Sequence, residues 1–76
     1  MDIKRLVGMA NDIARFYTAE PDREVALDEI ASHITRFWDP RMRRALAEHV
    51  ANGGEGLADL AREAAKRVRV PAGSVL

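Results

Sequence analysis

Residues 36–44 read Arg36-Phe37-Trp38-Asp39-Pro40-Arg41-Met42-Arg43-Arg44, and the rest of the chain is organised around this stretch. Proline fixes its own φ and disfavours the α region for the residue before it, so a helix that arrives through Trp38 should end at Asp39. Asp39 is a favourable N-cap, and Pro40 suits the first position of a new helix, which needs no N–H. The stretch predicts a tight corner between two helices, with Phe37 in the core and Trp38 at its edge.

Apolar residues recur at helical spacing on both sides of this corner. The pattern predicts an all-α fold, a compact bundle of four short helices over about 3–19, 23–38, 40–52 and 57–68. Asp2 and Asp22 are candidate caps, and Gly53-Gly54 should end the third helix because glycine readily adopts the left-handed conformation. We expect a single helical domain over 1–70 and a flexible tail over 71–76.

Two adjacent aromatic residues, Phe16 and Tyr17, lie near the end of the first predicted helix. Neighbouring positions lie about 100° apart on a helix, so we expect one ring at the centre of the core and the other at its edge.

The chain has 76 residues, of which 47% are hydrophobic and 32% are charged. This balance is typical of one small globular domain, whose core supplies only a modest net stability. There is no Cys, so no disulfide stabilises the fold, and a partner surface becomes the expected source of extra stability. The absence of Cys also suits a cytoplasmic location. Neither a signal peptide nor a membrane-spanning helix is expected.

Twelve basic and twelve acidic residues cancel, which argues against a protein held to nucleic acid mainly by phosphate contacts. The charges are unevenly spread, with a net of −2 over residues 1–38 and +2 over 39–76. An early acidic patch and a later basic patch are expected to attract each other weakly within the fold. The acidic patch is Glu20, Asp22, Glu24, Asp28 and Glu29, and the basic patch is Arg41, Arg43 and Arg44.

No catalytic, cofactor-binding or metal site is predicted. His33 and His49 are the only imidazoles, and each is expected to pack at or within a helix face, since a zinc site needs three or four convergent ligands. The glycine-rich run Gly53-Gly54-Glu55-Gly56 follows a helix and lacks the lysine of a phosphate-binding loop, so helix termination explains it better.

The corner itself supports two interpretations. Trp and Arg dominate binding energy at protein interfaces, so a partner interface is predicted at Arg36, Trp38, Arg41, Arg43 and Arg44. The opposing interpretation is that Trp38 only covers the end of its own core. A second functional hypothesis is a small helix-turn-helix nucleic-acid-binding protein whose recognition helix begins with the arginines, although the turn lacks the usual glycine.

Three segments carry a family resemblance. They are Leu6-Val7-Gly8-Met9-Ala10-Asn11-Asp12-Ile13-Ala14, Phe37-Trp38-Asp39-Pro40-Arg41-Met42-Arg43 and Gly53-Gly54-Glu55-Gly56-Leu57. Together they resemble the delta subunit of the soluble, NAD-dependent, molybdenum-containing formate dehydrogenases, over about residues 3–67.

The resemblance implies a non-catalytic accessory subunit of a cytoplasmic complex, with the catalytic alpha subunit as the partner. That complex oxidises formate at molybdenum bound by two pyranopterin guanine dinucleotides and passes electrons through iron–sulfur clusters and FMN to NAD. This chain is expected to bind none of these groups, because it has neither Cys nor a dinucleotide fingerprint. The resemblance leaves open whether the subunit is permanent or an assembly factor.

Overall fold

The computed structural model describes residues 2–70 of the chain. Its four helices are α1 (Ile3–Phe16), α2 (Arg23–Phe37), α3 (Pro40–Ala51) and α4 (Asp59–Ala65), and the described residues contain no strand. The prediction of an all-α bundle of four helices is therefore confirmed. The tail predicted over 71–76 lies outside the described residues.

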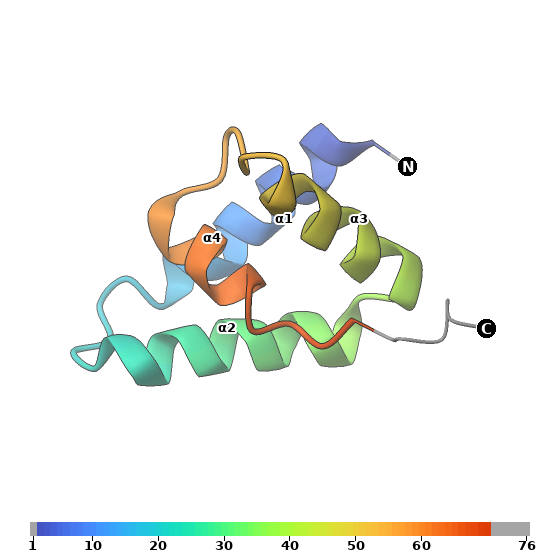
Figure 1. Cartoon of the computed structure of the whole chain (residues 1–76). Helices are drawn as coiled ribbons and strands as arrows, with labels where there is room; N and C mark the ends of the chain where they lie inside the picture. The colour runs from blue at the N-terminus through green and yellow to red at the C-terminus, as the bar shows by residue number, and fades with distance from the viewer. Residues whose placement is uncertain (1, 71–76) are drawn as a thin grey trace.

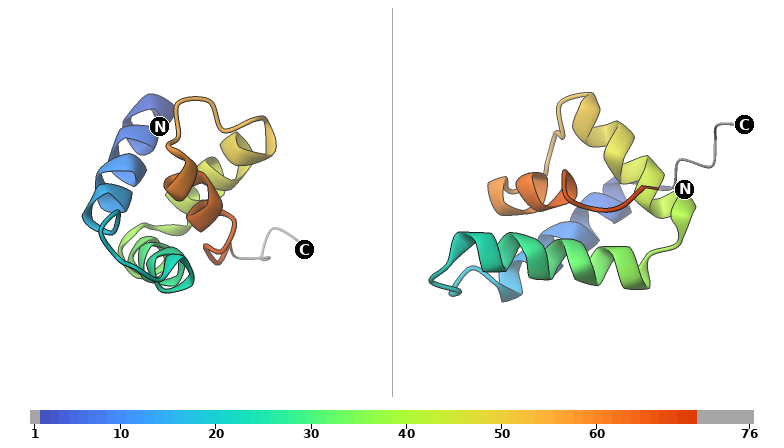
Figure 2. Two further views of the ribbon diagram at one scale, coloured as in Figure 1. Left: turned by 90° about the vertical axis from the view of Figure 1, so that its left-hand side faces the viewer. Right: turned by 60° about the horizontal axis from the view of Figure 1, so that its bottom comes forward.

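Helix α4 lies at the centre of the arrangement, where it contacts α1, α2 and α3 (Figure 1). Figure 2 shows α1, α2 and α3 arranged around it, and the segment after α4 runs along α2 toward the end of that helix. A short central helix has to approach three neighbours closely, and its buried residues are all alanine: Ala61, Ala64 and Ala65. The largest side chains that are fully buried are those of Ile30 and Ile34 on α2 and Leu46 on α3.

Aspartates begin the first three helices, as predicted. The side chain of Asp2 accepts a hydrogen bond from the backbone N–H of Lys4 at 3.0 Å, and Asp22 accepts one from Glu24 at 2.9 Å. At the corner, Asp39 accepts from Met42 at 3.0 Å. Each bond satisfies a donor that has no partner within its helix.

Glycines end α3 as the sequence predicts. Gly53 and Gly54 have φ values of 113° and 64°, and the N–H of Gly54 donates to the carbonyl oxygen of His49 at 2.8 Å. The positive φ values explain why glycine stands there.

The prediction for the two aromatics at the corner is wrong. Phe37 is 68% exposed, whereas Trp38 is only 5% exposed and belongs to the core. Trp38 follows the buried Ile34 by one helical turn and is the C-cap of α2, with an extended backbone (φ −95°, ψ 139°). Because the chain leaves the helix at this residue, the indole packs inward and the preceding Phe37 stays on the outer side.

The expectation for the end of α1 is also wrong. Phe16 is 88% exposed, and Tyr17 is half-buried against the core, so neither ring lies at its centre. Helix α1 ends at Phe16, and the residues predicted as its last turn form a non-helical turn.

Helix α4 is shorter than predicted, because its flanks bond elsewhere. Before the helix, the N–H of Ala58 donates to the side chain of Asn11 at 2.9 Å. After it, residues 66–68 donate to carbonyls three residues earlier, which forms tight turns in place of α-helix.

Candidate partner interface

The helix corner at 37–40 is built as the cap chemistry requires, but it does not present Trp38 to a partner. The N–H of Trp38 continues α2 by donating to the carbonyl oxygen of Ile34 at 2.9 Å, and the indole is buried. A side chain that is 5% exposed contributes little surface to a contact. Trp38 was predicted as an interface residue because its ring was expected to be available to a partner, and its burial does not fit that expectation. The structure favours the opposing interpretation, in which Trp38 covers its own core.

Arg43 has a structural role in holding the corner. Its Nε donates to the carbonyl oxygen of Trp38 at 3.1 Å, and its Nη1 donates to the carbonyl oxygen of Arg69 at 2.6 Å. The guanidinium thus joins α3 to the end of α2 and to the segment after α4. Both acceptors have no partner within a helix, so a charged donor satisfies them well.

The other three predicted arginines remain at or near the surface. Arg36 and Arg41 are exposed and Arg44 is half-buried. Within residues 2–70, none of the three lies within ion-pair distance of a carboxylate. Arg36 lies over the ring of Phe37, with its guanidinium carbon 5.6 Å from the ring centroid. The corner therefore keeps cationic groups that a partner can use.

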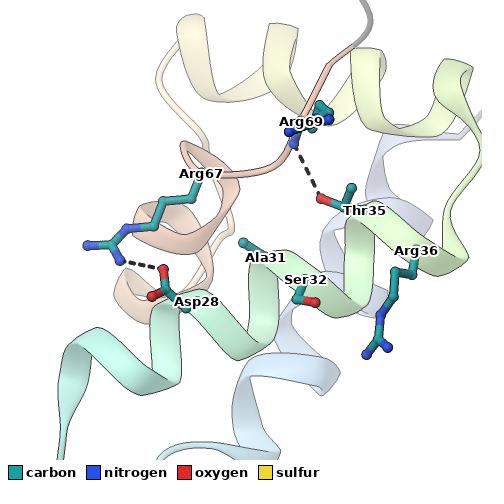
Figure 3. A pocket seen from close by; sticks show the side chains of 7 residues that line it. All are labelled: Asp28, Ala31, Ser32, Thr35, Arg36, Arg67 and Arg69. Atoms are coloured by element: carbon teal, nitrogen blue, oxygen red, sulfur yellow. Dashed lines mark hydrogen bonds and ion pairs between the residues drawn. The ribbon is translucent and has the colours of Figure 1, made fainter.

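The acidic patch pairs with a different part of the chain than expected. Glu24 and Asp28 accept hydrogen bonds from Arg67 at 2.6 and 2.8 Å, the second of which is drawn in Figure 3. The bond to Glu24 and then the bond to Asp28 raise the pKa of Arg67 above its ordinary value. Through Arg67, Glu24 and Asp28 hold the segment after α4 against α2. Among the described residues, no ion pair joins the acidic patch to the basic patch of Arg41, Arg43 and Arg44.

An aromatic surface that sequence reasoning missed lies beside the corner. His33 and Phe37 pack with ring centroids 4.7 Å apart at 41°, and His33 also borders a hollow of about 370 Å³ together with Phe16. The rest of that hollow is lined by Ile13, Tyr17 and Asp12. We call Phe16, His33 and Phe37 the aromatic face. The available signal was the position of Phe16, which lies outside the helical spacing that Leu6, Ala10 and Ala14 share.

Two features that carry the family resemblance have a structural role: Asn11 and the glycine loop, residues 53–56. The Asn11 amide donates to the carbonyl oxygen of Gly56 at 2.9 Å, and its oxygen accepts from the N–H of Ala58 at 2.9 Å. His49 Nε2 lies 2.8 Å from the carbonyl oxygen of Glu55, so it must be the protonated nitrogen that donates there. These bonds fix the loop before α4 against α1 and α3.

The described residues, 2–70, have neither a metal-binding cluster nor a membrane-spanning helix. That part of the chain contains no group of three His, Cys, Asp or Glu side chains placed to hold a metal ion. None of its helices is both long and apolar enough to cross a membrane.

Comparison with known proteins gives one match. The family model described as NADH-dependent formate dehydrogenase delta subunit (FdsD) matches residues 5–65. No curated protein and no solved structure matches the chain. The matched range includes the capped corner, the Asn11 contacts and the glycine loop, and it spans most of the chain. The protein therefore belongs to the family of NADH-dependent formate dehydrogenase delta subunits.

Proposed function

We propose that this chain is a non-catalytic accessory subunit of a cytoplasmic NADH-dependent formate dehydrogenase, and that it acts by direct contact with the catalytic alpha subunit. The family match over residues 5–65 carries the proposal, because it covers nearly all of the four-helix bundle. On this proposal the subunit stabilises the complex or helps to assemble it.

The side-chain chemistry is consistent with a subunit that leaves redox chemistry to its partners. Iron–sulfur clusters are bound by cysteine thiolates, and this chain has no Cys. Of its two imidazoles, His49 donates to a backbone carbonyl and His33 stacks on Phe37. We therefore propose that the molybdenum cofactor, the iron–sulfur clusters, FMN and NAD of the complex are bound by other subunits.

The cationic residues of the corner are proposed to contribute to the contact. Arg36, Arg41 and Arg44 are the members of the predicted interface whose guanidinium groups form no hydrogen bond or ion pair among the described residues, whereas Arg43 is bonded to two backbone carbonyls. Arginine forms planar, bidentate bonds to carboxylates, so acidic groups on the alpha subunit would suit them. Arg43 and Trp38 support this surface from within.

The alternative hypothesis, a helix-turn-helix protein that binds nucleic acid, is weakened because one of its expected contact residues is already bonded within the chain. Arg43 is one of three arginines that would begin a recognition helix, and both of its described bonds are to backbone carbonyls of its own chain. A helix-turn-helix protein needs such side chains free to reach phosphates or bases.

The test is to co-express the complex with an affinity tag on the alpha subunit and measure the stoichiometry of this chain on active enzyme. One copy for each alpha subunit supports a permanent subunit. Recovery only on enzyme that lacks its cofactors supports an assembly factor. If the chain copurifies with neither form, the proposed function is wrong.

A further inference from the structure

The aromatic face leaves the rings of Phe16 and Phe37 exposed, at 88% and 68%. Within residues 2–70, the large hydrophobic side chains described as exposed are Phe16, Val25 and Phe37, and both phenylalanines are among them. Single exposed apolar residues are normal, but a contiguous group of exposed rings beside a hollow is typical of a binding surface. Phe16 and Phe37 lie on two different helices and are connected through His33, which borders the hollow and packs on Phe37.

The face is bordered by positive charge. Arg36 lies over Phe37 and also lines a second hollow, of about 360 Å³, between α2 and the segment after α4 (Figure 3). That hollow also contains Arg69 and the hydroxyl groups of Ser32 and Thr35. Its one carboxylate, Asp28, is bonded to Arg67. Neither Arg36 nor Arg69 has a carboxylate within ion-pair distance in the described part of the chain.

An apolar centre with a polar, charged border is the arrangement found at protein interfaces. Aromatic rings supply the affinity when they are desolvated, and the border charges set the orientation and the choice of partner. A complementary surface needs apolar side chains opposite the rings and carboxylates opposite Arg36. On the side facing α1, Asp12 and Arg15 are 3.2 Å apart and largely satisfy each other, so the free charge lies on the arginine side.

We propose that the aromatic face, bordered by Arg36, docks onto an apolar patch of the alpha subunit that is edged by aspartate or glutamate. The inference rests on the proposed function, because membership of a delta-subunit family is what provides a larger partner. It moves the centre of the contact from the buried Trp38 to the exposed Phe37 and adds α1 to the interface through Phe16.

The test uses the co-expressed complex with the tagged alpha subunit and compares Phe16→Ala, Phe37→Ala and the double variant with wild type. Truncating an anchor ring commonly weakens binding by about tenfold, so we expect about a hundredfold weaker binding for the double variant. Val25→Ala is the matched control, because Val25 is 43% exposed and lies in the first turn of α2, away from the aromatic face. We expect it to bind within about twofold of wild type.

A charge reversal tests the border. Arg36→Glu should weaken binding at low salt, and its difference from wild type should shrink at high salt, where surface charges are screened. Thermal unfolding of each free variant, followed by circular dichroism, establishes that the fold is intact, as expected for side chains this exposed.

The outcomes separate the two proposals. If wild type fails to copurify with the alpha subunit, the proposed function and this inference both fail. If wild type binds and the double variant binds equally well, only the docking face is wrong. A third outcome is that the free wild-type chain forms a dimer, the double variant is a monomer, and the double variant still binds the alpha subunit as wild type does. In that case the face joins two copies of this chain, and the inference is overturned.

Discussion

The guanidinium of Arg43 on α3 donates from Nε to the backbone carbonyl oxygen of Trp38, the residue that ends α2, over 3.1 Å. The same group reaches the carbonyl oxygen of Arg69 at 2.6 Å. One side chain therefore connects three segments that meet at the helix corner, and it does so through acceptors that no helix satisfies.

Arg43→Ala should lower the free energy of unfolding by about 1–2 kcal/mol, because two charge-assisted hydrogen bonds are lost and two carbonyls lose their donor. Arg41→Ala is the control. Arg41 is exposed and forms no described hydrogen bond or ion pair, so a change within about 0.5 kcal/mol is expected. Urea unfolding of the free chain measures both. Equal stability of the two variants would show that Arg43 does not hold the corner.

Trp38→Ala should destabilise the fold severely, by about 3–5 kcal/mol, because it removes the largest side chain of the core. The core of a domain this small rarely supplies more than about 3–5 kcal/mol of net stability, so the loss is comparable to the whole stability and a large fraction of the variant should be unfolded at 25 °C. Trp38→Phe keeps part of the volume and should retain a cooperative, lower melting transition. Circular dichroism against temperature is the measurement, and a Trp38→Ala melt like that of wild type would contradict the burial of this ring.

The same residues show how far sequence reasoning reaches. Asp39 and Pro40 determine the corner by local chemistry alone, since cap bonds and a fixed φ need no knowledge of the rest of the fold. The aspartate caps and the glycine ending of α3 were predictable for the same reason. Helical periodicity likewise located the buried side of each helix.

The orientation of adjacent aromatics was not predictable from periodicity. Phe37 and Trp38 are neighbours at a helix end, and the backbone turn at the C-cap decides which of them faces inward. Arg43, which is five residues further along the chain, donates a hydrogen bond to the Trp38 carbonyl oxygen and so holds that turn. The role of Asn11 depends on contacts 45 and 47 residues away, which no local pattern reveals. The aromatic face is missed for a related reason, because it combines side chains of two helices.

Arg67 should contribute stability that depends on salt. It bridges Glu24 and Asp28 at the surface, and such pairs weaken as ionic strength rises. Arg67→Gln should lower the melting temperature at low salt, and the difference from wild type should narrow at high salt. Arg15→Gln, which removes a single exposed pair with Asp12, should cause a smaller change.

The sign of the pH dependence follows from the raised pKa of Arg67. A raised pKa in the folded state gives a stabilising contribution that is complete below the unfolded pKa and is lost only as pH rises through the folded pKa. Both values lie in the strongly alkaline range for arginine. The guanidinium of Arg67 should therefore contribute the same stability throughout the neutral pH range. Thermal melts of Arg67→Gln and wild type should show a difference in melting temperature that does not change with pH in that range.

Two glycines should respond in opposite ways to the same substitution. Gly56 has a φ of 88°, and a Cβ there would lie 3.3 Å from Cγ1 of Val7 on α1. Gly56→Ala should cost about 1–2 kcal/mol, because L-residues disfavour this conformation and the loop would press on α1. Gly8 lies inside α1, where an added Cβ meets nothing within 4 Å, so Gly8→Ala should raise stability by about 0.5–1 kcal/mol. Urea midpoints of the two variants should fall on opposite sides of wild type. If Gly56→Ala is neutral, the loop can relax, and the contact between the Gly56 carbonyl and Asn11 does not constrain it.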